Sequence, residues 1–389
     1  MQILTVDVGT GTQDILLYDS RVDLENSFKL VVPSPTMIVH QRIREATKRG
    51  DAILLSGVTM GGGPSHWAAR DHAQAGYPIY ATPDAARTFD DNLDLVTNSG
   101  IRVISEDEAK PLSNSTVHIV LRDFDFALIA RSFEGYGVSM KNLDAVAVAV
   151  FDHGAAPPEI SDRQFRFDYL DERIRKKPHL STFAFLSDDV PPIMTRLGAV
   201  VASAVGFDAP LMVMDTAPAA ISGASFDPVV RSHPRVMIVN VGNFHTLAFR
   251  LGEGRIEGVF EHHTGLIDLQ KLEGLLRSLA DGSLSRESVF DDHGHGALVY
   301  EQEPLNLGDD TFDVVVTGPR RSMFSVETQR RNLSSLRPYF AAPFGDMMIA
   351  GCFGLLAAVA DQFPDLGEPI RKSLSGVGGH GRPPWEINE

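Results

Sequence analysis

A pattern of strands around a glycine-rich turn occurs twice in the sequence and constrains the fold more than any other feature. In its first copy, apolar or alternating segments predict strands at Ile3–Val6, Asp14–Tyr18 and Asp23–Val32, and the turn Gly9-Thr10-Gly11-Thr12 separates the first two. A helix is predicted to follow at Met37–Arg49. The chain therefore opens with a tight hairpin, a third strand and a helix.

The second copy begins in the second half of the chain. Strands are predicted at Val236–Val241, Phe244–Leu251 and Arg255–Phe260, with the turn Gly242-Asn243 between the first two. A helix with one leucine-rich face is predicted at Asp268–Ala280. Because a whole unit returns in the same order, we expect a duplicated architecture.

Strands and helices alternate outside these units as well, which predicts an α/β fold with largely parallel or mixed sheets. We expect an N-terminal lobe with insertions over residues 1–210 and a C-terminal lobe over residues 211–389. The charge-dense segment Asp162–Lys177 is interpreted as a solvated helix face or an inserted surface element.

Composition excludes several classes of function. The formal net charge of −16 argues against binding to nucleic acid or to an anionic membrane. One cysteine, Cys352, cannot form an internal disulfide, hold an iron–sulfur cluster or build a cysteine-based zinc site. The start of the chain does not resemble a signal peptide, and the apolar segment Met347–Ala360 is shorter than the ~20 residues that span a bilayer. We therefore expect a cytoplasmic protein whose partner is a small molecule, with its oligomeric state left open.

The first glycine turn has the residues of an anion site. Gly9 and Gly11 let the backbone approach a ligand closely, and the hydroxyl groups of Thr10 and Thr12 can point at an anion with the backbone N–H groups. Asp7, at the end of the strand, would hold a cation against that anion, and Mg²⁺ with phosphate is the natural pair. A plain hairpin turn would also favour glycine, so this alternative stays open.

The second turn offers matching residues. Gly242 and Asn243 occupy the equivalent turn, and Thr246 follows it. Neither the Walker loop nor the dinucleotide-binding glycine fingerprint accounts for these turns. If the two hairpins face each other across a cleft, they can grip one phosphate chain from both sides.

Five segments in order resemble the sugar kinase/Hsp70/actin superfamily and together cover nearly the whole chain. They are LTVDVGTGTQDILLYD, MDTAPAAISGA, VMIVNVGNFHTLAFRL, DVVVTGPRR and GDMMIAGCFGLLAAVA. The resemblance implies two duplicated actin-like or ribonuclease H-like domains, with ATP and Mg²⁺ held in the cleft between them. It implies phosphate contacts from the first and third segments and an adenosine contact from the fourth, at Gly318. The chain departs from the family pattern at Asn240, where aspartate is usual, and at Pro319, where a second glycine is usual.

Other segments resemble an uncharacterised family that carries the label of a pyruvate formate-lyase activating enzyme. These are TMGGGPSHWAARDH, FDHGAAPPEISDRQFRF, NVGNFHTLAF and EHHTG. The label implies radical chemistry on an iron–sulfur cluster, which needs three clustered cysteines. A chain with one cysteine does not fit that activity.

Two further carboxylates are candidates for taking a proton from an attacking hydroxyl group. Asp152 ends an apolar strand, where active sites form in α/β sheets, and Asp215 lies in the second of the five segments. A helix cap or another structural role is the alternative for each of them.

Histidines and acids also gather in the second half of the sequence. Imidazoles beside carboxylates can bind a transition metal or a substrate anion, or they can support loops. The residues concerned are His262, His263, His293 and His295, with Glu261, Asp291 and Asp292 beside them.

The sequence thus favours an ATP-dependent phosphotransferase that acts on a small molecule, with Asp7, Asp152 and Asp215 as the catalytic candidates. One alternative is a nucleotide-dependent switch or assembly protein, like actin or a chaperone. Another is a metal-dependent enzyme that uses the histidines.

Overall fold

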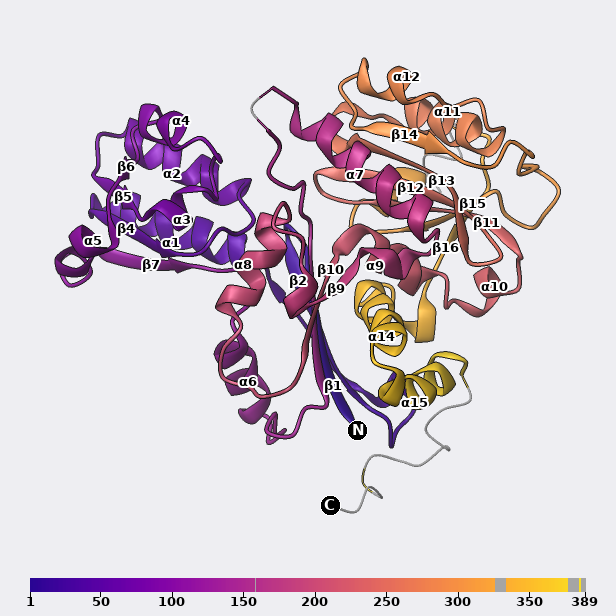
Figure 1. Cartoon of the computed structure of the whole chain (residues 1–389), viewed down its shortest axis with the longest axis horizontal. Helices are drawn as coiled ribbons and strands as arrows, with labels where there is room; N and C mark the ends of the chain where they lie inside the picture. The colour runs from indigo at the N-terminus through magenta and orange to yellow at the C-terminus, as the bar shows by residue number, and fades with distance from the viewer. Residues whose placement is uncertain (158, 326–333, 377–384, 386–389) are drawn as a thin grey trace.

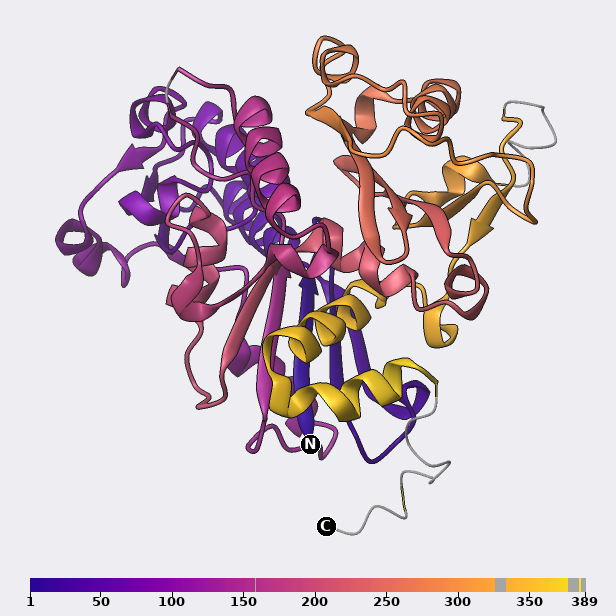
Figure 2. The same cartoon turned by 45° about the vertical axis from the view of Figure 1, so that its right-hand side comes forward.

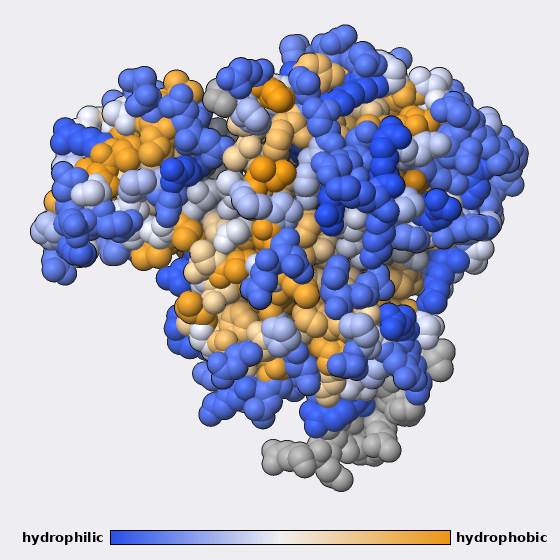
Figure 3. Space-filling model, in the orientation of Figure 1, coloured by the Kyte–Doolittle hydropathy of each residue, from blue (hydrophilic) through white to orange (hydrophobic). Residues whose placement is uncertain are grey.

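The structure is a computed structural model, and it describes residues 1–157, 159–325, 334–376 and 385. Figures 1 and 2 show two lobes that meet at a waist, with a smaller inserted unit beside the first lobe. Hydrophilic side chains cover most of the second lobe on the face drawn in Figure 3, as expected for a chain with 51 acidic residues.

The first lobe is built on a six-stranded sheet. In sheet order its strands are β3 (Phe28–Pro33), β2 (Thr12–Asp19), β1 (Gln2–Val8), β8 (Ala145–Val150), β10 (Leu211–Asp215) and β9 (Ala184–Leu186). Strands β3, β2 and β1 are antiparallel neighbours, and β8 and β10 continue parallel to β1. All six residues of β8, AVAVAV, are buried, because helices cover both faces of this part of the sheet.

The second lobe repeats five strands of this order. Its strands are β14 (Gly296–Val299), β13 (Arg255–His263), β12 (His245–Gly252), β11 (Arg235–Val241), β15 (Val314–Thr317) and β16 (Pro338–Phe340). Strand β14 is added beside the hairpin, and the described residues of this lobe contain no counterpart of β9. Strands β13, β12 and β11 are antiparallel neighbours, and β15 and β16 continue parallel to β11. The expected duplication is therefore confirmed, because both sheets start with the same antiparallel hairpin and extend from it with parallel strands.

A third sheet of four parallel strands forms the inserted unit between β3 and β8. Its strands, in sheet order, are β6 (Arg102–Val103), β5 (Ile79–Ala81), β4 (Ile53–Gly57) and β7 (Val117–Leu121). Its helices are α1 (Pro35–Arg49), α2 (Pro64–Gln74), α3 (Pro83–Ala86), α4 (Leu93–Asn98) and α5 (Glu106–Leu112). The helix predicted at Met37–Arg49 thus exists as α1, but it packs in this unit and not on the first sheet.

The remaining helices cover the two large sheets. They are α6 (Phe126–Glu134), α7 (Asp162–Lys176), α8 (Thr195–Ser203), α9 (Thr216–Ala224), α10 (Pro228–Arg231), α11 (Leu269–Ala280), α12 (Arg286–Phe290), α14 (Ala350–Gln362) and α15 (Pro364–Leu374). Helices α6 and α8 pack on one face of the first sheet, and α14 and α15 pack on the other (Figure 2). Helices α7 and α9 cover the inner face of the second sheet, and α11 covers its outer face. None of the helices in the described part of the chain has the length and apolar character that a membrane span requires.

Helices α9 and α14 cross at the waist, where glycines let their backbones touch. A side chain at Gly223 would collide with the carbonyl oxygen of Ala350, and one at Gly354 would collide with that of Ala219. Strand β10 lies in the first sheet and α14 returns to it, so the chain passes between the lobes more than once. The division at residues 210/211 stays a prediction about domain bounds and does not coincide with the division between the sheets.

Candidate functional site

The two lobes and the inserted unit border an open cavity of about 1010 Å³. The first lobe contributes Asp7 to Thr12 and the segment after β8, and the inserted unit contributes Gly61 to Gly63. The second lobe contributes its glycine turn and the end of β15, and the start of α14 closes the base. Most of the residues that the sequence singled out therefore border one space.

The two glycine turns have the same closure. The N–H of Gly9 donates to the carbonyl oxygen of Thr12 at 2.9 Å, and the N–H of Gly242 donates to that of His245 at 3.0 Å. The turns also contact each other at the cavity, because a Cβ on Gly11 would lie 3.1 Å from Nδ2 of Asn243.

The inserted unit touches the second lobe through Phe244, the third residue of the second turn. The ring of Phe244 lies edge-on to Trp67 of α2, with the ring centroids 5.7 Å apart. A Cβ on Gly63 would lie 2.8 Å from the same ring. The inserted unit thus forms one wall of the cavity and contacts the second lobe there.

Two carboxylates face each other at the end of the first hairpin. Asp7 of β1 pairs in register with Asp14 of β2, and both residues line the cavity. Burial raises the pKa of Asp7 to about 6 and that of Asp14 to about 8, and the neighbouring negative charges add to both shifts. The Thr216 hydroxyl donates to Oδ1 of Asp7 at 2.5 Å. Oδ1 of Asp14 is buried and has no hydrogen-bond partner among the described residues.

Asp14 was not among the predicted site residues. The signal that could have identified it is the strand period, because Thr12 and Asp14 are two residues apart and so lie on the same face of β2. Nothing in the local pattern, however, distinguishes the cavity face from the other face.

Asp152 lies at the cavity, but both of its oxygens already accept hydrogen bonds. Oδ1 accepts from the N–H of Gly154 and Oδ2 from the N–H of Leu197 in the first turn of α8, each at 2.8 Å. Burial raises its pKa. These bonds match the structural alternative, in which the carboxylate caps a helix.

Asp215 does not line the cavity. Its Oδ1 accepts from the N–H of Ala217 and caps α9, and its Oδ2 lies 2.8 Å from Nη1 of Arg166. The structure therefore places this carboxylate behind the cavity wall and not at its surface.

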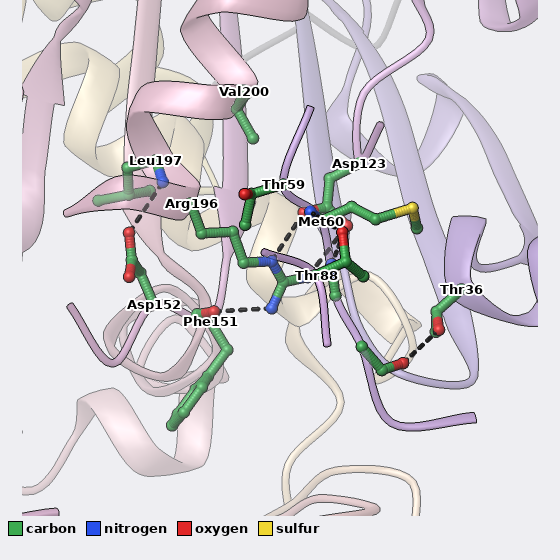
Figure 4. A network of polar contacts seen from close by, with 12 residues as sticks. Thr36, Thr59, Met60, Thr88, Asp123, Phe151, Asp152, Arg196, Leu197 and Val200 are labelled. Atoms are coloured by element: carbon green, nitrogen blue, oxygen red, sulfur yellow. Dashed lines mark hydrogen bonds and ion pairs between the residues drawn. The ribbon is translucent and has the colours of Figure 1, made fainter. Parts of the chain in front are cut away.

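A partly buried ion pair joins the inserted unit to the first lobe beside Asp152 (Figure 4). Arg196 at the start of α8 lies 2.7 Å from Asp123, and it also donates to the carbonyl oxygen of Phe151 at 2.7 Å. Asp123 in turn accepts from the N–H of Gly61 at 3.1 Å. Arg196 and Asp123 both border the cavity and were not among the residues singled out from the sequence.

The remaining residues of the second lobe divide between the cavity and the core. Asn240 and Gly318 line the cavity, and Gly318 has φ +96°, where a side chain would collide with Asn240. Thr246 does not reach the cavity, because it is buried and its hydroxyl lies 2.9 Å from that of Thr264. The residue equivalent to Thr12 is His245, since each closes its turn with its carbonyl oxygen.

The histidines form a different group from the one that the sequence suggested. His295 and Glu261 lie together, but their partners are His153, after β8, and His245, at the start of β12. His262 bonds instead to the backbone of His263 and Asp292, and His293 is exposed. The neighbouring Asp291 is exposed as well, and Asp292 pairs with Lys271.

Electrostatics favour neutral imidazoles at His153 and His295 beside a charged Glu261. Burial lowers the pKa of His295 to about 3 and that of His153 well below its usual value. Burial would raise the pKa of Glu261, but its neighbours, above all the Arg166 guanidinium, hold that pKa well below its usual range.

Arg166 anchors this group from behind. Its Nε lies 2.6 Å from Oε2 of Glu261, and its Nη1 lies 2.8 Å from Asp215, so it links the two lobes. The side chain is only 2% exposed. The interpretation of Asp162–Lys177 as a solvated face is therefore wrong for one side of α7, because Arg166, Phe167 and Leu170 are buried there.

A family model described as "Putative pyruvate format-lyase activating enzyme (DUF1786)" matches residues 60–323. The chain belongs to this family. The matched region contains His153, His245, Glu261 and His295 as well as the second glycine turn, and it begins after the first turn. The activity in the description requires a cluster of cysteines, and Cys352 is the only one in the sequence.

The comparison with curated proteins found no match. Similar solved structures include a ROK hexokinase from Thermus thermophilus, with 13% identity over 94% of this chain and 100% of that chain and a TM-score of 0.32. The activator of 2-hydroxyisocaproyl-CoA dehydratase from Clostridium difficile with bound ADPNP has 9% identity over 96% and 98% of the two chains and a TM-score of 0.34. MreB5 of Spiroplasma citri bound to ADP has 10% identity over 90% and 94% and a TM-score of 0.31.

Proposed function

We propose that the cavity binds ATP with Mg²⁺ and that the protein transfers a phosphoryl group to a small-molecule acceptor. The observation that carries this proposal is the pair of matching glycine turns, one from each lobe, which meet over a single cavity. Exposed backbone N–H groups at such turns bind anions, and two turns can hold one phosphate chain from both sides. Gly9, Thr10, Gly11 and Thr12 would serve the first turn, and Gly242 and Asn243 the second.

The residues at the first turn fit a magnesium ion. Mg²⁺ binds through one or two carboxylates and keeps several waters, and Asp7 and Asp14 offer two facing carboxylates with a buried, unpartnered oxygen. Mg²⁺ in this position would neutralise charge on the phosphates during transfer. The carboxylates of Asp7 and Asp14 would hold it, and Thr216 would orient Asp7 through its hydrogen bond.

The other predicted residues take more distant roles in this proposal. Asn240 and Gly318 would border the nucleotide from the second lobe, since both line the cavity. Asp152 remains the candidate for a general base in the first lobe. Its hydrogen bond to the backbone N–H of Leu197, however, favours a role in positioning α8. Asp215 would act only through Arg166.

The test measures binding and turnover separately. We expect ATP with Mg²⁺ to raise the melting temperature of the full chain, because a ligand at ~100 times its dissociation constant adds about 2.7 kcal/mol of apparent stability. Asp7→Asn should keep the fold and lose the Mg²⁺-dependent part of that shift, together with ATP turnover. Asp107→Asn is a suitable control, because that carboxylate is 88% exposed in α5.

Two outcomes contradict the proposal. The cavity is not a nucleotide site if ATP leaves the melting temperature of the wild-type chain unchanged at millimolar concentration. The assignment of Asp7 fails if Asp7→Asn turns over ATP with an acceptor as fast as Asp107→Asn does. Turnover that depends on polymerisation, with no acceptor, would instead support an assembly protein.

A further inference from the structure

We propose that His153, His245, Glu261 and His295 bind one divalent first-row transition metal ion at the junction of the two lobes. Each residue offers one ligand atom, and these four atoms all lie within 4.8 Å of one another. A metal bound at 2.0–2.2 Å sets its ligand atoms about 3.4 Å apart in a tetrahedral site, so the most distant of the four atoms would draw in by about 1–1.5 Å.

The ligand atoms converge on one point, where they contact one another without a well-formed hydrogen bond. Oε1 of Glu261 lies 2.9 Å from Nδ1 of His245 and 3.6 Å from Nδ1 of His295. Among the residues that the structure describes, these three buried atoms have no hydrogen-bond partner of acceptable geometry. Buried polar atoms in folded proteins almost always form hydrogen bonds, so three atoms that meet at one point with ion-pair contacts alone indicate a missing ligand.

The surroundings keep the ligand atoms available. Arg166 occupies Oε2 of Glu261 at 2.6 Å, and this leaves Oε1 directed at the histidines. The backbone N–H of His295 donates to the carbonyl oxygen of Glu261 at 2.9 Å, which ties the two ligands together at the sheet edge. Such outer contacts orient the ligands of metal sites.

The donor set selects the kind of metal. Three imidazole nitrogens and one carboxylate oxygen suit zinc, iron, cobalt or nickel, and they differ from the all-oxygen set that Mg²⁺ prefers. The site is therefore distinct in chemistry from the carboxylate pair at Asp7 and Asp14.

The position of the ligands links the metal to the arrangement of the lobes. His153 follows β8 of the first lobe, whereas the other three ligands belong to the β12–β13–β14 edge of the second lobe. His153 and His245 also line the large cavity, so a bound ion would lie at the cavity wall. An ion here would join the lobes and border any substrate in the cavity.

The test uses Co²⁺ on the full chain, stripped of metal with a chelator and kept free of nucleotide. We expect one Co²⁺ per chain, visible absorption bands from nitrogen and oxygen ligands, and a rise in melting temperature. His153→Gln and His245→Gln should weaken Co²⁺ binding by at least about 100-fold and remove the bands. His153 and His245 are the less buried ligands, and circular dichroism of the metal-free variants checks that they fold.

His293→Asn is the matched control. That imidazole is exposed two residues from His295, at φ +65°, a conformation that asparagine tolerates, so Co²⁺ binding should stay as in the wild type. The proposal is overturned if the wild-type chain binds no Co²⁺, or if folded His153→Gln and His245→Gln bind it as tightly as His293→Asn does. A chain that binds Co²⁺ but not ATP would support this site while contradicting the proposed phosphotransfer.

Discussion

In both lobes the first two strands of the sheet join through a turn that a glycine N–H closes, and the side chains around that turn differ. In the first lobe the paired residues beside the turn are Asp7 and Asp14, whereas in the second lobe they are Asn240 and Leu247. The turn itself ends in a threonine in the first lobe and in His245 in the second. One backbone plan thus places two carboxylates beside the turn of one lobe, and an amide, a leucine and a histidine beside the turn of the other.

The helices that cover the two sheets also differ between the lobes, in their burial and in how closely they pack. Helix α14 on the first sheet is buried almost throughout and touches α9 through Gly354. Helix α11 on the second sheet is amphipathic, and its Gly274 faces open space. The helix on the first lobe therefore packs closely against α9 where the lobes meet, whereas the helix on the second lobe has one face exposed to solvent.

The largest expected effect comes from copying the second lobe's pair into the first. The double variant Asp7→Asn, Asp14→Leu should lower ATP-dependent phosphotransfer by about 10³-fold or more, because it removes both carboxylates that would hold Mg²⁺. Steady-state assays with the acceptor measure this loss. A double variant whose rate stays within tenfold of the wild type would mean that phosphotransfer does not depend on the carboxylate pair, and that the residues of the turn itself account for the difference between the lobes.

The next effect is on stability at the waist. Gly354→Ala should lower the free energy of unfolding by about 2–4 kcal/mol, because its Cβ would collide with the backbone of Ala219 and separate α9 from α14. Urea denaturation followed by circular dichroism gives the value. A loss below about 0.5 kcal/mol would show that the crossing is looser than the contact implies.

The carboxylate pair also predicts a pH dependence of stability that the equivalent pair in the second lobe, Asn240 and Leu247, cannot produce. Burial raises the folded-state pKa of Asp14 to about 8, so between about pH 4 and pH 8 the folded chain keeps a proton that the unfolded chain releases. Stability should fall as pH rises, by up to ~1.4 kcal/mol per pH unit for this group. Asp7, with a pKa of about 6, adds to the slope mainly below pH 6.

Asp14→Asn should remove the contribution of Asp14 and flatten the slope between pH 6 and pH 8. Urea denaturation with a chelator present, at several pH values in that window, makes the comparison. Equal slopes for the wild type and the variant would mean that Asp14 is ionised in the folded chain throughout this range.

The smallest effect is a gain in stability on the second lobe. Gly274→Ala should raise the free energy of unfolding by about 0.5–1 kcal/mol, because alanine favours a helix interior and nothing lies within 4 Å of the added Cβ. The same denaturation assay applies. A loss at this position would remove the contrast with Gly354, since both glycines would then be required by packing.

The strands and turns of both repeats could be predicted because their signals are local. Alternating or apolar runs predict β1, β2, β11 and β12, and glycines indicate the turn within each pair of strands. The helix that follows the first three strands was also predicted, but α1 belongs to the inserted unit. A periodic pattern identifies a helix and cannot say which sheet it covers.

The candidate site was predictable in part for the same reason. Asp7, Gly9 and Gly242 stand next to turns that the sequence marks, and the structure brings them to one cavity. Thr246 was misplaced by one position, which in a strand moves a side chain to the opposite face. In the sequence, Arg166 is one of many charged residues in its segment. Its burial depends on its ion pairs with Asp215 of the first lobe and Glu261 of the second.

The sequence by itself determined that the chain would repeat one hairpin and place glycines, threonines and an aspartate at its ends. Tertiary structure alone decided that His153 meets His245, Glu261 and His295, and that Asp14 faces Asp7. The physical reason is that strand period and turn chemistry depend on neighbouring residues, whereas a cluster depends on how separate strands dock. The burial that sets the charge of each group exists only once the lobes have come together.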